Sequence, residues 1–509
     1  MNINYDVVVV GAGNAGLVAA LKASKEGKKV LLIDNNNIPG GIATSTLKGN
    51  FEFENSLHKL TGIMTDDNKG VIRKIFDEFE ISDKIEWIKL TEGYKIIKLD
   101  NIKEEYIIPI GVDDFIKKME EYVPNSKDKL SEFFELSKEI YNAMNYVYDS
   151  KEIDIDYLKQ TYPNFVNTAS YSLETVLKKL KLPKLLEQII TSYWINFGTS
   201  SINLNFAHYI SEFYKFISFG AVIPKNRSFE ISSLLEKQIR DSGADVWFNE
   251  EVIKINLENN SIKSITTKSN KTILTNHLIC NTSLNNVCGK LIDYNNIPKE
   301  MIKLTNTRKL GLKAFNLSLG LNKSAEELGI KNYMYYIYNS LDSNTELENL
   351  KKAGNYTMVL TCLNVINKEA SKEGTCMINA TLYYSGDCYD KIFNDNNYFK
   401  IEEKIQNKII DTIETALEIN IKDYIEEFNF NSPIIYSRYN NSIDGCIYGY
   451  LESNDDSVLS RILNKEEELK IKGLRLCGSN SYYGHSYEST YRNGYEVAEE
   501  TLKDIEKGE

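Results

Sequence analysis

Near its N-terminus the chain carries Tyr5-Asp6-Val7-Val8-Val9-Val10-Gly11-Ala12-Gly13-Asn14-Ala15-Gly16, a β-branched run that leads directly into three closely spaced glycines. The valines are typical of a strand that is buried on both faces of a parallel sheet. A helix-forming stretch follows from Leu17 to Glu26, Gly27 ends it, and Val30 to Ile33 supplies a second strand with Asp34 at its tip. The sequence therefore predicts a strand–turn–helix–strand unit of about thirty residues.

The three glycines have the spacing of a dinucleotide-binding turn. Gly11 permits the tight turn after the strand, Gly13 lets the backbone approach a pyrophosphate, and Gly16 lets the helix pack closely on the strand. The helix N-terminus then offers free N–H groups to the phosphates, and the carboxylate of Asp34 stands where it can accept hydrogen bonds from an adenosine ribose. Because strand, helix and acid all occupy the expected positions, we interpret the turn as a dinucleotide site and not as a chance glycine loop.

A second glycine pair, Gly40-Gly41, follows Asp34 after five intervening residues. This acid-x5-Gly-Gly pattern resembles the extended FAD fingerprint of the amine oxidase and phytoene desaturase superfamily, in which the loop runs beside the ribityl-phosphate part of the flavin. Plain NAD dehydrogenases do not need the second pair, so the resemblance implies FAD as the cofactor. The residues expected to contact it are Gly11, Gly13, Asn14, Ala15, Gly16, Asp34, Gly40, Gly41, Val252, Gly478 and Ser479.

The resemblance extends along nearly the whole chain. Residues 49–58 resemble the "G-F-x-F-D-x-G-x-H" stretch of phytoene desaturases, carotenoid isomerases and retinol saturases, with Glu54 and Ser56 in place of the usual Asp and Gly. Residues 220–255 resemble a second family block, in which Val252 would present its backbone to the adenine. In that block Lys225-Asn226-Arg227-Ser228 stands where the family has glycines, so a bulkier loop is expected there.

Two further blocks lie near the C-terminus. Residues 432–449 resemble the family's "T-P-x-T-x-x-R-Y-…-G-x-I-Y-G" pattern, and residues 473–498 resemble its final strand–glycine–helix junction. In the family this junction lies against the ribityl chain and the pyrimidine edge of the flavin. Gly478 keeps the glycine, and Ser479 replaces the usual Asp with a hydroxyl that can still bond a ribityl oxygen.

The resemblance implies a mixed α/β fold with a Rossmann-type FAD-binding domain that is interleaved with a substrate domain of mixed sheet and helices. The FAD-binding domain is expected to comprise residues 1–80, 220–300 and 441–509. The substrate domain is expected to comprise residues 81–219, largely helical, and residues 301–440, which supply a sheet and a helix.

The pattern of the substrate domain predicts several elements. Lys84 to Leu90 and Tyr94 to Leu99 are predicted to pair as neighbouring strands, and Lys313 to Leu321 alternates like a third strand. The stretch Ile401 to Leu417 is predicted to be a helix that buries one isoleucine-rich face. The many aromatic residues between 193 and 219 either line an apolar tunnel or form core, and the sequence leaves both readings open.

Composition excludes several classes of protein. A net charge of −12 argues against a nucleic-acid partner and against attachment to anionic lipid by charge alone. No stretch approaches about eighteen consecutive apolar residues, and the first strand begins too early to leave room for a signal peptide. The seven cysteines contain no CxxC pair, which argues against a zinc site and favours a reducing cytoplasm. Peripheral contact with a membrane and the oligomeric state stay open.

A polar run, His485 to Glu488, precedes the final helix where the polyene enzymes of the family are small and apolar. Buried beside a flavin, these side chains need partners, and a polar group of the substrate is one candidate. Alternatively they satisfy one another or cap the helix, with Ser489 or Thr490 as N-cap. His58 is either a polar group at the flavin or a structural histidine. The candidate catalytic residues are His485, Tyr487, Glu488 and His58, and no metal site is expected.

The resemblance implies an FAD-dependent oxidoreductase that adds, removes or rearranges C–C double bonds in a conjugated or lipid-like small molecule. The polar run suggests that this substrate bears a polar group. The alternative is a flavin amine or amino-acid oxidase, which the polar run also fits, although no aromatic cage or lysine is assignable to it from the sequence. A flavoprotein kept for structure or partner binding is a third reading, against which the intact cofactor motifs argue.

Overall fold

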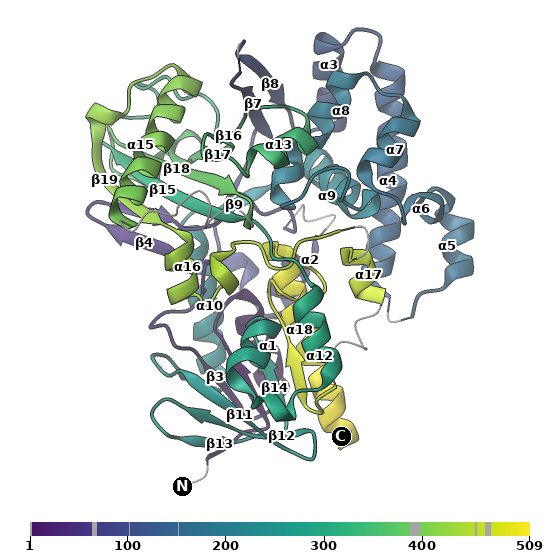
Figure 1. Ribbon diagram of the computed structural model, residues 1–509, viewed down its shortest axis with the longest axis vertical. Coiled ribbons are helices and arrows are strands. Elements are labelled where there is room, and N and C mark those ends of the chain that lie inside the picture. The colour runs from purple at the N-terminus through teal and green to yellow at the C-terminus, as the bar shows by residue number, and fades with distance from the viewer. Residues whose placement is uncertain are drawn as a thin grey trace.

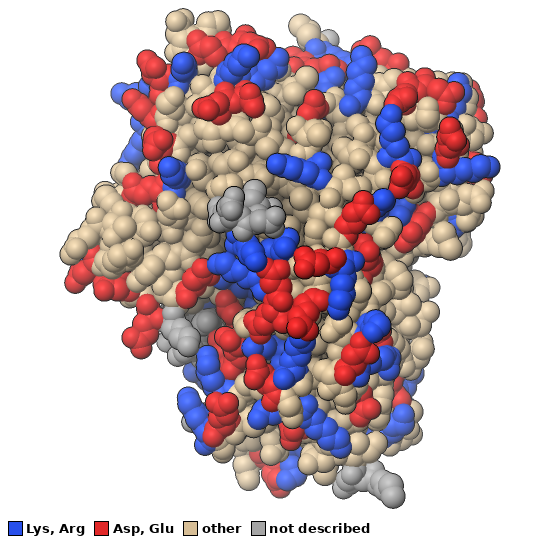
Figure 2. Space-filling model, turned by 180° about the vertical axis from the view of Figure 1, so that it is seen from behind, with Lys and Arg blue, Asp and Glu red and all other residues tan. Residues whose placement is uncertain are grey.

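The computed structural model describes residues 3–63, 69–100, 102–150, 152–386, 398–453, 456–463 and 470–508, so Cys388 lies outside the described residues. A parallel sheet with its helices forms the lower half of Figure 1, and a larger mixed sheet and a group of helices form the upper half. Acidic and basic side chains are interspersed over the face drawn in Figure 2.

The parallel sheet has at its centre the strand that precedes the first glycine turn, β2. Its five strands run in the order β10-β3-β2-β14-β20, and every neighbouring pair is parallel. The predicted strand–turn–helix–strand unit is confirmed, and its β-branched strands are almost completely buried. The strands are β2 (Val7–Val10), β3 (Val30–Ile33), β10 (Asp245–Trp247), β14 (Leu278–Cys280) and β20 (Leu474–Leu476).

Successive residues of these strands face opposite layers, as the period of two requires. Val7 and Val9 pack with a layer of helices, whereas Val8 packs with a four-stranded sheet of order β1-β13-β12-β11. The helical layer consists of α1 (Asn14–Lys25), α2 (Val71–Glu78), α10 (Arg227–Asp241) and α18 (Tyr487–Lys507). The second sheet consists of β1 (Ile3–Asn4), β11 (Val252–Glu258), β12 (Ser261–Thr267) and β13 (Thr272–Leu274), and α12 (Lys299–Thr307) lies beside it.

The larger sheet has seven strands in the order β19-β15-β18-β17-β16-β7-β8. Helix α15 (Tyr398–Leu417) packs its buried isoleucines on one face of this sheet, as the sequence predicts. The strands are β7 (Tyr94–Lys98), β8 (Glu104–Ile108), β15 (Lys313–Leu321), β16 (Met334–Tyr338), β17 (Met358–Cys362), β18 (Cys376–Tyr384) and β19 (Ile425–Asn431).

The predicted pairing of residues 84–90 with residues 94–99 is wrong. Strand β6 (Trp87–Lys89) pairs with β9 (Val222–Pro224), whereas β7 has β8 on one edge and β16 on the other. Both edges of β7 are therefore occupied, and β6 takes a partner far along the chain. A separate hairpin, β4 (Ser45–Lys48) with β5 (Phe51–Glu54), lies beneath the larger sheet.

A group of helices packs beside the larger sheet (Figure 1). Most of the aromatic residues between 193 and 219 form its core, because Tyr209, Phe213 and Phe216 are fully buried. Only Tyr193 and Phe197 of that set also line the cavity described below. These helices are α3 (Val112–Tyr122), α4 (Lys127–Asp149), α5 (Ile155–Thr161), α6 (Pro163–Thr168), α7 (Leu173–Leu180), α8 (Lys184–Thr191) and α9 (Phe206–Phe219). The shorter helices α13 (Ser343–Asn349), α16 (Pro433–Tyr439) and α17 (Val458–Leu463) lie elsewhere in the fold.

The two large sheets draw their strands from different parts of the chain. The parallel sheet uses strands that lie within residues 7–33, 245–280 and 474–476, whereas the seven-stranded sheet uses strands within residues 94–108 and 313–431. On this basis we propose that the chain divides into interleaved domains as the sequence indicates.

We expect the contact between α1 and α18 to be sensitive to one methyl group. A Cβ on Gly494 would lie 2.2 Å from the backbone oxygen of Ala15, so Gly494→Ala forces the two helices apart. Such overpacking is expected to lower the free energy of unfolding by about 1–3 kcal/mol, measured by urea titration. The control is Gly354→Ala, since nothing lies within 4 Å of a Cβ there. Equal midpoints for both variants would contradict a tight contact.

Candidate active site

A cavity of about 470 Å³ is lined by residues from both halves of the molecule. One end is lined by the first glycine turn, by Asp34 and by Val252. The other end is lined by residues of the helical group and of the larger sheet, among them Tyr193 and Tyr383. A volume of this size is typical of a ligand site.

The glycines of the two terminal motifs gather around the side chain of Asn281. A Cβ on Gly13 would lie 2.7 Å from Nδ2 of Asn281, and a Cβ on Gly478 would lie 2.2 Å from its Oδ1. Gly11 and Gly478 also have positive φ angles of 102° and 100°, which side chains disfavour. The sequence did not single out Asn281, although its position directly after β14 places it at the carboxyl edge of the parallel sheet, where ligands bind.

The N-terminus of α1 faces this cavity without a side-chain partner. Gly13 is the N-cap, and no side chain among the described residues caps the helix. Asn14 and Ala15, the first two residues of α1, line the cavity, and Oδ1 of Asn14 is buried without a hydrogen-bond partner in the described part of the chain. Gly16 lies deeper, since a Cβ there would come within 1.9 Å of the backbone oxygen of Gly11. The helix end thus offers unsatisfied N–H groups and its positive dipole end to an anion.

Asp34 holds two loops together at the far end of the cavity. Its Oδ2 accepts a hydrogen bond from the backbone N–H of Ala12 at 2.5 Å, and its Oδ1 accepts one from the N–H of Asn36 at 2.7 Å. Burial raises the pKa of this carboxyl above its usual value. The cavity is also lined by three consecutive residues, Glu250, Glu251 and Val252. The contact of Asp34 with a ribose stays a prediction.

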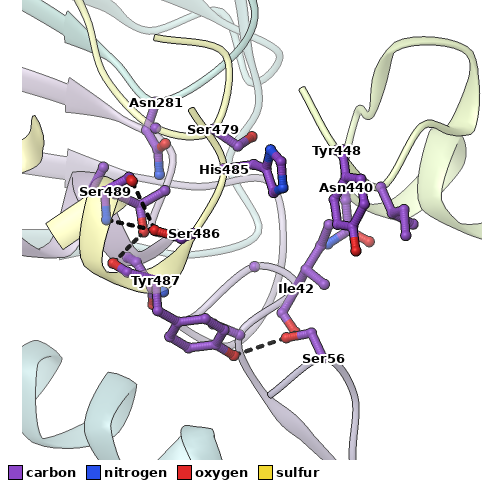
Figure 3. Close-up of a pocket in the computed structure, with 18 of the residues that line it drawn as sticks. Ile42, Ser56, Asn281, Asn440, Tyr448, Ser479, His485, Ser486, Tyr487 and Ser489 are labelled. Atoms are coloured by element: carbon purple, nitrogen blue, oxygen red, sulfur yellow. Dashed lines mark hydrogen bonds between the residues drawn. The ribbon is translucent and has the colours of Figure 1, made fainter. Parts of the chain in front are cut away.

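The second glycine pair runs along the first turn. Gly40 donates its N–H to the carbonyl of Ala12 at 2.8 Å and forms a bridge with Gly13. A Cβ on Gly41 would lie 3.6 Å from the Cα of Gly13. The loop therefore continues the cavity from the first turn toward Ile42 and Ser56 (Figure 3).

Two departures from the family pattern face each other in the structure. The carboxylate of Glu54 accepts hydrogen bonds from both the backbone N–H and the hydroxyl of Ser228, each at 2.8 Å. It also accepts from the N–H groups of Ser56 and Leu57. The longer acid at position 54 thus reaches the bulkier loop at residues 225–228, and the two changes compensate for one another.

His485 lines the middle of the cavity as a neutral imidazole. Its Nε2 lies 2.9 Å from the carbonyl oxygen of Asn196, and because a carbonyl only accepts, Nε2 carries the proton and Nδ1 is an acceptor. Its ring stacks on Tyr448 with 4.1 Å between ring centroids (Figure 3). Burial lowers its pKa to about 4, so the ring stays uncharged at neutral pH.

Tyr487 also lines the cavity, and its hydroxyl hydrogen is already used in a hydrogen bond. Its hydroxyl lies 2.8 Å from Oγ of Ser56, and Ser56 donates its single hydroxyl hydrogen to the carbonyl of Ile42. Tyr487 is therefore the donor in the bond to Ser56. Burial raises the pKa of Tyr487 well above its usual value, which keeps the phenol protonated.

The remaining members of the polar run have other roles. Ser486 is the N-cap of α18 and accepts from the N–H of Ser489 at 3.0 Å, so the prediction of Ser489 or Thr490 as N-cap is wrong because the helix begins earlier, at Tyr487. Glu488 is not among the described residues that line the cavity. Its Oε2 accepts from Nζ of the buried Lys215 at 2.8 Å.

His58 and its neighbour Lys59, which come from the N-terminal part of the chain, also line the cavity. Burial and the nearby Lys59 lower the pKa of His58 to about 4. Nζ of Lys59 lies 4.6 Å from the ring centroid of Tyr193 and 5.1 Å from that of Phe216. It donates to the hydroxyl of Tyr336 at 3.3 Å. The sequence analysis missed Lys59, because the rings around it come from distant parts of the chain.

Comparison with known proteins identifies the first part of the chain. Residues 6–96 match the family model described as FAD dependent oxidoreductase. The chain is 23% identical to the all-trans-retinol 13,14-reductase of Rattus norvegicus over 67% of this chain and 58% of that protein. It is 22% identical to the 1-hydroxycarotenoid 3,4-desaturase of a Flavobacterium species over 89% of this chain and 90% of that protein. With the prolycopene isomerase of Daucus carota it shares 23% identity over 98% of this chain and 80% of that protein.

The match places residues 6–96 in the FAD dependent oxidoreductase family. It spans only 58% of the length of the rat retinol reductase. Solved structures agree in fold. An oxidoreductase from Methanosarcina mazei superposes with a TM-score of 0.66 at 15% identity, covering 98% of this chain and 100% of that one. Cyclohexylamine oxidase from Brevibacterium oxydans superposes with a TM-score of 0.64 at 13% identity, covering 99% of each chain.

The residues of this FAD-dependent oxidoreductase fit the dinucleotide. The uncapped N-terminus of α1 offers N–H donors that the oxygens of a pyrophosphate would accept. The orphaned Oδ1 of Asn14 is an acceptor, and a hydroxyl group of the dinucleotide would satisfy it. The glycines around Asn281 leave a groove that any Cβ would fill. We propose that Gly11 to Gly16 and Asp34 hold the adenosine and pyrophosphate, and that Gly40, Gly41, Gly478 and Ser479 hold the ribityl part.

Asp34 supplies a direct test of this assignment. Charge-assisted hydrogen bonds contribute about 1.5–3 kcal/mol, so Asp34→Ala should weaken FAD binding by about tenfold to a hundredfold. Titration of the apoprotein with FAD, followed by flavin fluorescence, gives the dissociation constant. Asp245→Ala is the control, because it removes an exposed carboxylate from the neighbouring strand. If the dissociation constant for FAD were the same in Asp34→Ala as in the control, Asp34 would not contact the ribose.

Proposed function

We propose that this oxidoreductase adds, removes or rearranges C–C double bonds in a conjugated or lipid-like small molecule that bears a polar group. The observation that carries the proposal is the cavity, which continues beyond the dinucleotide groove into a chamber with aromatic walls. The reductase, desaturase and isomerase relatives, which are named for retinol and carotenoid chemistry, support this substrate class.

The walls of the chamber suit a flat, apolar chain. Tyr193, Phe197, Tyr383 and Tyr448 line it, and aromatic side chains of this kind bury large apolar area and exclude water. FAD, when bound, supplies the hydride chemistry, and the protein supplies binding and orientation. The side chains of the cavity therefore hold a conjugated substrate flat and position its polar end.

His485 is the side chain that we place nearest the reacting atoms. With Nε2–H donated to Asn196, its Nδ1 is left as an acceptor in the cavity, where it can orient a substrate hydroxyl or take a proton. Tyr487 and His58 line the same cavity as uncharged groups, and we retain both as candidates. Glu488 is bonded to Lys215 instead, so we no longer propose it as a catalytic residue.

An amine oxidase activity has less support. The amine oxidases among the solved structures share the fold at 10–13% identity, which carries no substrate information. In this chain the aromatic surroundings of Tyr193 and Phe216 already hold the cation of Lys59. A cationic amine would be repelled there. We also place the protein in a reducing compartment such as the cytoplasm. The thiols of Cys280, Cys288, Cys362, Cys376 and Cys477, which form no disulfide within the described residues, support this assignment. Among the described residues, no helix has the length and apolar character that a membrane span requires.

The proposal predicts a reaction with a polyene. The FAD-loaded protein, in both its oxidised and its dithionite-reduced forms, is mixed anaerobically with all-trans-retinol or a carotene. We expect the absorption band of the polyene to shift or bleach, with or without a change in the flavin band. Peroxide release on a panel of amines, together with unchanged polyene bands, would overturn the proposal in favour of an amine oxidase.

His485→Phe tests the role of the imidazole. The substitution keeps a ring beside Tyr448 but removes the acceptor, and we expect the rate of the polyene reaction to fall about tenfold or more, equivalent to about 1.4 kcal/mol in the barrier. FAD content, read from the absorption spectrum, should not change. His277→Phe is the matched control, because His277 is not among the described residues that line the cavity. Equal rates for the two variants would reduce His485 to a packing residue.

A further inference from the structure

We propose that Lys59 binds the polar group of the substrate and that this group is an anion, a carboxylate in the first instance. The inference rests on the proposed function, since it names the substrate class of the same cavity. The amino group of Lys59 has no acidic partner among the described residues.

Four other titratable or charged side chains that line this end of the cavity are paired. Glu212 is bonded to Lys215 at 2.8 Å, and Glu452 is bonded to Nδ1 of His208 at 2.9 Å. Arg461 is bonded through Nη2 to Asp456 at 2.8 Å. The set of paired cavity-lining groups is Glu212, His208, Glu452 and Arg461.

Lys59 has no acidic partner within the described ranges of the chain. Its recorded neighbours are the rings of Tyr193, Phe216 and Tyr336 and the Tyr336 hydroxyl. Burial is what lowers its pKa, to about 7, and no nearby acid opposes that effect. A desolvated ammonium without a counter-ion is costly, and a bound anion would remove that cost.

The hydroxyl of Tyr336 holds Lys59 in place from behind. It accepts from Nδ2 of Asn196 at 2.8 Å as well as from Nζ of Lys59 at 3.3 Å. Tyr336 is not among the described residues that line the cavity, whereas Lys59 is. An ammonium has three donors, so Nζ can bond Tyr336 and still donate to the oxygens of a carboxylate in the cavity.

Asn196 connects this anion site to the proposed reacting region. Its side-chain Nδ2 donates to Tyr336, and its backbone carbonyl accepts from His485. One residue thus fixes the distance between the two groups. A substrate whose carboxylate bonds Lys59 would lay the adjoining chain along Tyr193 toward His485.

The test compares carboxylates with matched alcohols on the FAD-loaded protein. Dissociation constants are measured by quenching of intrinsic fluorescence with all-trans-retinoic acid and all-trans-retinol, and with palmitate and hexadecanol. We expect the wild type to bind each carboxylate about tenfold or more tightly than its alcohol, as a charge-assisted contact would give. Lys59→Met should abolish this preference, and Lys59→Arg should keep part of it.

The control is Lys74→Met, which makes the same change of net charge at an exposed lysine that is not among the described residues lining the cavity. It should leave the preference for carboxylates unchanged. Equal losses for carboxylate and alcohol in Lys59→Met, or no preference in the wild type, would overturn the inference. If palmitate binds in a Lys59-dependent manner while neither polyene reacts, the anion site stands and the proposed polyene chemistry fails.

Discussion

The close approach of backbone segments around Asn281 is the constraint on which the rest of the structure depends. Gly13 and Gly478 belong to opposite ends of the chain, yet a Cβ on either would collide with the Asn281 side chain. Only glycine permits this approach, and Gly494 permits the equally close contact between α18 and α1. The three segments therefore form one groove, and the seven-stranded sheet is built from the chain that lies between them.

The cavity shows how a shared fold acquires its own chemistry. Around the glycine turns the chain keeps the glycines of the family pattern and differs from it at Glu54, Ser56 and Ser479, with Glu54 bonded to Ser228. At the other end of the cavity the polar groups of His485 and Lys59 stand among aromatic walls. We propose that the cofactor determines the reaction class and that His485 and Lys59 select the substrate.

The sequence predicts the parts of the structure that depend on local pattern. The strand before Gly11 and the helix after it follow from β-branched and apolar periodicity, and the buried face of α15 follows from its isoleucine spacing. Contacts between distant segments are not encoded in this way. The pairing of β6 with β9 and the aromatic surroundings of Lys59 depend on segments that only the complete fold brings together.

The most direct measurement of the central claim is a crystal structure of the FAD-loaded protein with all-trans-retinoic acid. We expect the FAD pyrophosphate at the N-terminus of α1, the polyene along Tyr193, and the carboxylate within about 3 Å of Nζ of Lys59. A dinucleotide bound away from Asn14, or a carboxylate directed away from Lys59, would contradict this claim.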